Sequence, residues 1–198
     1  HAIEKRDGRV GLCPFCRTPA PTSGEEIIER MQKRIEVVND TNAIYNLGCN
    51  YYHAAYGQPQ NRAKALELWH RAGELGSATS YYLIGVVYDL GEGVGRDEKK
   101  ATYYYELAAT ESREMARHNL GMSEGRAGNI DRALKHFMIA AGFGEKASLE
   151  KIKEMFMAGE ATKDDYAKAL QAYQANLVEI KSHQRDEAAA AHEIYKYY

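Results

Sequence analysis

The sequence has little cysteine and no long apolar run. Three cysteines in 198 residues are too few for a disulfide framework, a usage that favours a cytoplasmic or nuclear protein over a secreted one. No stretch approaches the roughly 20 consecutive apolar residues that a membrane-spanning helix requires. We therefore expect a cytoplasmic or nuclear chain without a membrane span.

An excess of charge of one sign is also missing. The formal net charge is −2, and no basic run exceeds two residues, as at Lys99-Lys100. Proteins that bind nucleic acid or anionic membranes usually carry a clustered basic surface. We therefore expect neither nucleic acid nor a membrane as a partner.

No catalytic set can be assembled from the residues. The glycine-rich stretch at 91–95 follows a predicted helix and lacks the Lys-Ser/Thr pair of a phosphate-binding loop. His192-Glu193 lacks the second histidine of a zinc protease. The repeat region therefore predicts no enzymatic activity and no small-molecule substrate.

A helical unit occurs three times in the sequence, and a weaker fourth copy follows, with periods of 32 to 37 residues. Its first mark is a Leu/Ile-Gly pair at Leu47-Gly48, Ile84-Gly85 and Leu120-Gly121. Its second mark is a basic-Ala pair at Lys64-Ala65, Lys100-Ala101, Arg132-Ala133 and Lys168-Ala169. Such periods are typical of solenoids, in which each helix pair contacts only its neighbours.

The second helix of each unit carries a stripe of small and aromatic residues. Four positions after the alanine of the basic-Ala pair stand Trp69, Tyr105, Phe137 and Tyr173, and three units then have Ala72, Ala108 and Ala140. The spacing i, i+4, i+7 places each set on one helix face, which predicts close packing between helices.

A glycine recurs inside the first helix of three units, although glycine costs roughly 1 kcal/mol relative to alanine there. Gly48, Gly85 and Gly121 occupy one register, and we expect two backbones to approach closely at each. The corresponding residue of the fourth unit is Lys153. The fourth unit is thus degenerate, as expected of a terminal repeat.

Residues 41–175 resemble the Sel1-like repeats, which are relatives of the tetratricopeptide repeats. The match lies in the Leu/Ile-Gly pairs with a following tyrosine, in the G-x-G-V-x-x-D motif at 91–97, and in the basic-Ala pairs. The third unit departs from the pattern, with Glu124 in place of the tyrosine and a shorter loop. The resemblance implies an all-α fold, an α/α superhelical solenoid of helix pairs that acts as an adaptor and catalyses no reaction.

Segments outside the repeats complete the predicted organisation. Residues 1–22 form an irregular segment, and residues 23–40 form an N-terminal capping helix that begins with a capping box at Ser23 and Glu26. Its predicted apolar stripe is Ile27, Ile28, Met31, Ile35 and Val38. After the repeats, residues 176–198 are predicted to form a capping helix. The stretch from about residue 164 to 198 reads as one helix, or as two with a break near Ser182.

Resemblance to tetratricopeptide arrays also assigns residues to the concave face. The positions three before and one, four and five after the repeat glycine give candidate partner-binding residues Tyr45, Cys49, Tyr52, His53, Tyr82, Asp89, His118, Met122 and Arg126, together with Val86, Leu90 and Gly125. Tyrosine suits a peptide-binding wall because it offers a large contact area with few rotamers. Tyrosines at this spacing also serve as packing between helices, and the sequence leaves both interpretations open.

The segment Cys13-Pro14-Phe15-Cys16-Arg17 is a separate motif. Cys13 and Cys16 have the spacing of two zinc ligands and need two further ligands to complete a tetrahedral site. The motif resembles the last ligand pair of a RING zinc finger. That resemblance implies that the earlier ligands lie upstream and that Arg17 contacts the conjugating enzyme and ubiquitin. A loop without metal, another zinc knuckle and a redox pair remain alternatives.

Two functions are consistent with these patterns. The first is a non-catalytic scaffold that binds a segment of a partner protein on the concave face of the repeat array. The second is the substrate-recruiting part of a RING-type ubiquitin ligase whose zinc-binding domain is truncated in this chain. The second function would add zinc as a cofactor through Cys13 and Cys16.

Overall fold

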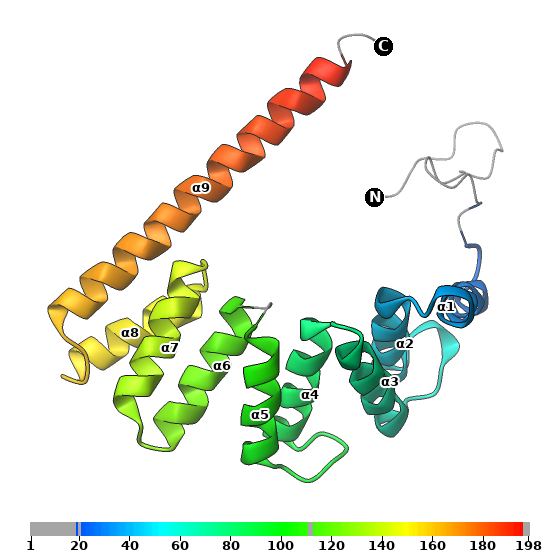
Figure 1. The fold of residues 1–198 in the computed structure, drawn as a ribbon, viewed down its shortest axis with the longest axis horizontal. Helices are drawn as coiled ribbons and strands as arrows, with labels where there is room; N and C mark the ends of the chain where they lie inside the picture. The colour runs from blue at the N-terminus through cyan, green and yellow to red at the C-terminus, as the bar shows by residue number, and fades with distance from the viewer. Residues whose placement is uncertain (1–18, 20, 111–112, 196–198) are drawn as a thin grey trace. The chain divides into compact units, whose positions relative to one another are not determined.

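The computed structural model describes residues 19, 21–110 and 113–195, with the backbone alone for residue 113 and residues 185–195. The chain divides into two units, residues 1–77 and residues 78–198. The zinc-ligand candidates Cys13 and Cys16, and also Arg17, lie outside the described residues. Each unit is built from helices that follow one another in sequence and pack as pairs (Figure 1).

The first unit contains α1 (Gly24–Val38), α2 (Thr41–His53), the short 3₁₀ turn η1 (Ala55–Gly57) and α3 (Arg62–Glu74). The capping box at the start of α1 is present, because Ser23 accepts a hydrogen bond from the Glu26 backbone N–H at 3.2 Å. The Glu26 carboxylate reaches back to the backbone N–H of Thr22 at 2.8 Å. The predicted apolar stripe is confirmed at Ile28, which is buried. The prediction is wrong at Val38, which is 66% exposed at the end of the helix.

The second unit contains α4 (Ala78–Leu90), α5 (Glu98–Ala108), α6 (Arg113–Arg126), α7 (Ile130–Gly142), α8 (Lys146–Met157) and α9 (Lys163–Tyr195). Helices α4 and α5 pack as one pair and α6 and α7 as the next. Helix α9 begins beside α8, packs against both α7 and α8, and then projects beyond them (Figure 1). It is one continuous helix, so there is no break near Ser182, whose hydroxyl donates to the Val178 carbonyl at 3.1 Å. The predicted boundary between residues 175 and 176 falls inside it.

The repeat glycines are explained by the aromatic stripe. A Cβ placed on Gly48, Gly85 or Gly121 would lie 2.6 Å from the ring of Trp69, Tyr105 or Phe137, respectively. In the first two repeats the next neighbour is a backbone carbonyl, of Ala65 or Ala101, at 3.3 Å. The expected close approach of two backbones is therefore only part of the reason, because the nearest obstacle is the ring of the second helix.

The fourth repeat packs differently. Lys153 stands at the register of the repeat glycine and is exposed, while its neighbour Ile152 is fully buried. The aromatic contact of this repeat is made by Phe156 and Tyr166, whose rings stack at 5.9 Å. The degenerate sequence of this repeat thus corresponds to a different packing of α8 on α9.

Candidate functional site

Side-chain hydrogen bonds join α4, α6 and α8, which are the first helices of the repeats in the second unit. We call these three helices the first-helix layer. Arg126 of α6 donates to Asp89 of α4 at 2.9 Å. His118 of α6 shares a hydrogen bond of 2.8 Å with the buried Ser148 of α8. The second helices α5 and α7 pack against this layer. Candidate partner-binding residues of α4 and α6 therefore come together in one layer.

Tyr82 is half-buried and packs between helices. Its ring lies 6.0 Å from the ring of Tyr105, and both phenols hydrogen-bond to the side chain of Asn119. Burial raises the pKa of Tyr82, and the bond to Asn119 opposes that rise. The phenol of Tyr82 therefore contributes to the contact between α4 and α6.

His118 is also half-buried, with its ring 5.5 Å from that of Phe137. Burial lowers the pKa of His118, Glu145 opposes that change, and Lys151 reinforces it. The imidazole is therefore held in the neutral form, which suits its bond to Ser148. Because Ser148 has no exposed surface, this pair does not form an accessible nucleophile and base.

Asp89 and Arg126 belong to a small network of charges. Arg96 lies 3.8 Å from Asp89 and 2.7 Å from Glu98, and Arg126 lies 3.9 Å from Glu98. Exposed ion pairs of this kind contribute about 0 to 1 kcal/mol each. The network ties α4, the start of α5 and the end of α6 together, so both candidate residues already have partners within the fold.

A cleft of about 430 Å³ opens between α6 and α8, with α7 as its floor. Three predicted concave-face residues line it, namely Met122, Gly125 and Arg126. Sequence reasoning missed the rest of the lining, which α6, α7, α8 and the following turn supply: Gly121, Ile130, Ala133, Phe137, Lys151, Glu154, Met155, Ala158 and Glu160. The cleft therefore joins residues of the third and fourth repeats.

The cleft exists because of the residue four positions after the repeat glycine. In the first repeat this residue is Tyr52, whose ring lies 5.2 Å from that of Trp69, and in the second it is Asp89. In the third repeat it is Gly125, where a Cβ would meet only the Cβ of Ala133, at 3.9 Å. The missing side chain leaves the space open, and an unexplained glycine inside a helix was the signal for it in the sequence.

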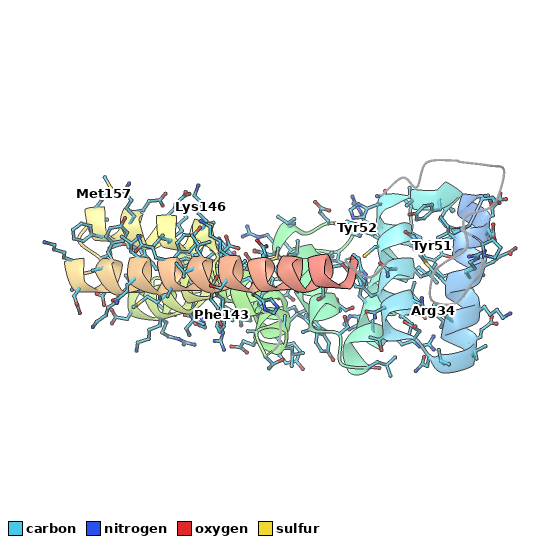
Figure 2. The ribbon with its side chains drawn as sticks, turned by 90° about the horizontal axis from the view of Figure 1, so that it is seen from above. Arg34, Tyr51, Tyr52, Phe143, Lys146 and Met157 are labelled. Atoms are coloured by element: carbon cyan, nitrogen blue, oxygen red, sulfur yellow. The ribbon has the colours of Figure 1, made fainter. Side chains whose placement is uncertain are left out.

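The candidate residues of the first unit share one face of α2. Tyr45 and Cys49 interact. The pKa of Tyr45 is raised to about 12, mainly by burial and to a smaller extent by the neighbouring Cys49. Burial also raises the pKa of the Cys49 thiol. Tyr52, labelled in Figure 2, packs on Trp69, while His53 is exposed and meets the Tyr52 ring edge-on at 5.0 Å. This face is aromatic, and the Arg62 guanidinium lies 5.7 Å from the centre of the Tyr52 ring.

The described parts of the chain offer neither a metal cluster nor a membrane span. Residues 19, 21–110 and 114–184, whose side chains the structure describes, contain no group of three or more His, Cys, Asp or Glu side chains that could hold a metal ion. None of the helices described in this structure is both long and apolar enough to cross a membrane.

Comparison with known proteins identifies the repeats. The Sel1 repeat matches residues 41–77, 78–112 and 115–141. A search of the curated proteins finds no match. Two similar crystal structures are a protective antigen from uropathogenic Escherichia coli strains that displays an SLR fold and a Sel1 repeat protein from Oxalobacter formigenes.

Both structures are 24% identical to this chain with a TM-score of 0.66. The matches cover 77% and 79% of this chain, and 33% and 64% of the antigen and of the Oxalobacter protein, respectively. This chain thus spans about a third of one and less than two thirds of the other. The fold is accordingly an all-α superhelical solenoid of helix pairs. Because the repeats match half of the sequence, the chain belongs to the Sel1 repeat family.

Proposed function

We propose that this chain is a non-catalytic interaction scaffold that binds a segment of a partner protein on the first-helix layer of its second unit. Solenoids of helix pairs present extended surfaces of this kind and serve generally as protein-binding scaffolds. The site of binding is the cleft between α6 and α8, together with Tyr82 and His118 of the same first-helix layer.

The cleft is the observation that carries this proposal. Its floor is made by Ala133 and Phe137, which belong to the buried core of the second unit. Apolar concave sites with a few polar groups at the rim are the usual form of a binding site. The rim here carries Arg126 and Lys151 beside Glu154 and Glu160. A partner residue that enters the cleft would bury apolar surface on both sides.

Variants at Gly125 test the proposal directly. Gly125→Leu should fill the cleft, and leucine is a strong helix former, so the fold should persist. Gly125→Ala adds one methyl group in a place with room and serves as the matched control. Proteins captured by the full chain from cells of its source should be lost with Gly125→Leu and kept with Gly125→Ala. A partner that Gly125→Leu still binds would show that the cleft is not the site.

A second pair of substitutions tests the first-helix layer. Tyr82→Ala combined with His118→Ala removes two rings of the first-helix layer, and circular dichroism should show unchanged helicity. We expect partner capture to be lost. If capture survives in a protein of normal helicity, these two residues are not part of the binding surface.

We propose as a second candidate function a role in substrate recruitment for a RING-type ubiquitin ligase. Its support is the sequence motif from Cys13 to Arg17, with Cys13 and Cys16 as zinc ligands and Arg17 as a contact to the conjugating enzyme and ubiquitin. We also propose a cytoplasmic or nuclear location. Native mass spectrometry of the protein purified from its source should detect zinc, followed by a ubiquitin transfer assay. A full-length protein without zinc would exclude this role.

A further inference from the structure

The walls of the cleft are apolar and adaptable. Met122 on α6 and Met155 on α8 line it from opposite sides, and Ile130 lies at the start of α7. Methionine side chains are flexible and polarisable, so they adjust to inserted groups and make favourable contacts with aromatic rings. Residues with little or no side chain, Gly125 and Ala158, leave room in the cleft.

Three of the four charged side chains that line the cleft, those of Arg126, Lys151 and Glu154, are paired with neighbours. Arg126 donates to Asp89 at 2.9 Å and to the Ser123 hydroxyl at 3.3 Å. Lys151 donates to Glu154 at 2.7 Å. An acidic side chain entering the cleft would have to displace one of these pairs, and a basic one would be desolvated against apolar walls. An acidic side chain therefore has no prepared partner in the cleft, and a basic one would find only the exposed Glu160 at the rim.

The volume limits what can enter. About 430 Å³ lies near the lower end of the roughly 300 to 1,000 Å³ typical of binding pockets. This space accommodates one large side chain with part of its backbone and excludes a whole helix. The cleft is thus suited to a single anchoring residue.

We infer that the partner segment inserts one large uncharged apolar side chain, such as leucine, methionine, phenylalanine or tryptophan, between Met122 and Met155. Recognition is by burial of apolar surface and not by charge. This inference rests on the proposed function and adds the chemistry of the anchor. It predicts that binding at the cleft is insensitive to salt, because screening weakens only charged contacts.

Apolar side-chain analogues test the inference without a known partner. The protein is labelled with ¹³C at its methionine methyl groups. Indole and toluene are then added in separate titrations, with acetate and butylammonium as charged controls. Indole and toluene should shift the Met122 and Met155 signals saturably, with dissociation constants on the order of 1 mM. Met157, which is 77% exposed at the end of α8 and labelled in Figure 2, should not shift and is an internal control.

Variants and salt sharpen this experiment. Gly125→Leu should weaken indole binding roughly tenfold or more, because the leucine side chain occupies the cleft. Gly125→Ala should bind indole as the parent protein does. Raising the salt from about 0.05 to about 0.5 M should leave the titration unchanged. Saturable shifts with acetate or butylammonium, or no shift with indole at about 10 mM, would overturn the inference.

The two proposals fail in distinguishable ways. If partner capture is lost in Gly125→Leu while only the charged analogues bind, the cleft is the site but the anchor is not apolar. If indole binds in the cleft while partner capture survives Gly125→Leu, the cleft accepts apolar groups but the partner binds elsewhere.

Discussion

Two consecutive turns of α6 each contain a glycine, and the surroundings of the two glycines differ. Around Gly121 the helix is closed, because the ring of Phe137 lies where a Cβ would stand. Around Gly125, one turn later, the helix is open and lines the cleft. The same residue type in the same helix therefore serves close packing in one turn and leaves a cleft in the next.

The comparison separates a repeated feature from an individual one. Gly121 has counterparts in Gly48 and Gly85, each covered by an aromatic ring, so it belongs to the construction of every complete repeat. Gly125 has no glycine counterpart, since Tyr52 and Asp89 occupy its register. A residue that differs at a position otherwise filled is the better guide to a function specific to this chain.

The largest effect should come from removing the ring that closes the first turn. Phe137 is 4% exposed, and replacing a buried phenylalanine by alanine costs about 3 to 5 kcal/mol. We expect Phe137→Ala to lower the free energy of unfolding by that amount in urea denaturation. Phe143→Ala, at a residue that is 41% exposed, is the control and should cost much less. Equal losses would mean that the ring over Gly121 has no special role.

Adding a methyl group at the closed turn should destabilise the protein less strongly. A Cβ at residue 121 would meet three atoms of the Phe137 ring within 3 Å, and overpacking costs roughly 1 to 3 kcal/mol. The gain in helix propensity returns at most about 1 kcal/mol. Gly121→Ala should therefore lower the urea midpoint, and much of that loss should vanish in the Phe137→Ala background. An unchanged penalty in that background would contradict the steric explanation.

The same methyl group at the open turn should have the opposite sign. The cleft leaves space at residue 125, and an alanine in a helix is favoured over glycine by about 0.5 to 1 kcal/mol. Gly125→Ala should raise the urea midpoint by a corresponding amount. Destabilisation by Gly125→Ala would show that the turn is closed in solution and would remove the basis for the cleft.

The smallest effect concerns the pH dependence contributed by His118. Burial lowers its pKa in the folded protein, with Glu145 opposing and Lys151 adding to that change. The unfolded chain therefore binds the proton more tightly, so this contribution to stability is present above about pH 6.5 and is lost as the pH falls through the lowered folded pKa.

The urea midpoint should thus be lower at about pH 5 than at about pH 7.5, and His118→Gln should reduce the difference. Only part of it will disappear, because burial also lowers the pKa values of His70 and His136. If His118→Gln leaves the difference unchanged, His118 does not contribute to the pH dependence.

The periodic part of the fold could be predicted because the packing of each repeat depends on residues that are close together in the sequence. The aromatic and small residues of the second helix, such as Trp69 and Ala72, are both buried as the spacing predicts. The cap at Ser23 followed from contacts only three residues apart. In contrast, Val38 was misplaced because a helical period does not reveal where the neighbouring helix ends.

The candidate site was predicted only in part, for a related reason. Met122, Gly125 and Arg126 were found from their register to the repeat glycine, and all three line the cleft. Lys151 and Met155 were missed because they belong to α8, in a repeat whose sequence no longer follows the pattern. Tyr82 and His118 lie in the first-helix layer, and only the structure shows that Asn119 and Ser148 hold them.

The sequence by itself determined the order of helices, their pairing and the face that each second helix buries, because spacing along the chain sets these features. The tertiary structure decided which glycine is covered and which is open, since that depends on the distance from α6 to rings and methyl groups of α7 and α8. Contacts between helices depend on shape as well as on period. A cleft between repeats therefore emerges only when the side chains of both helices are in place.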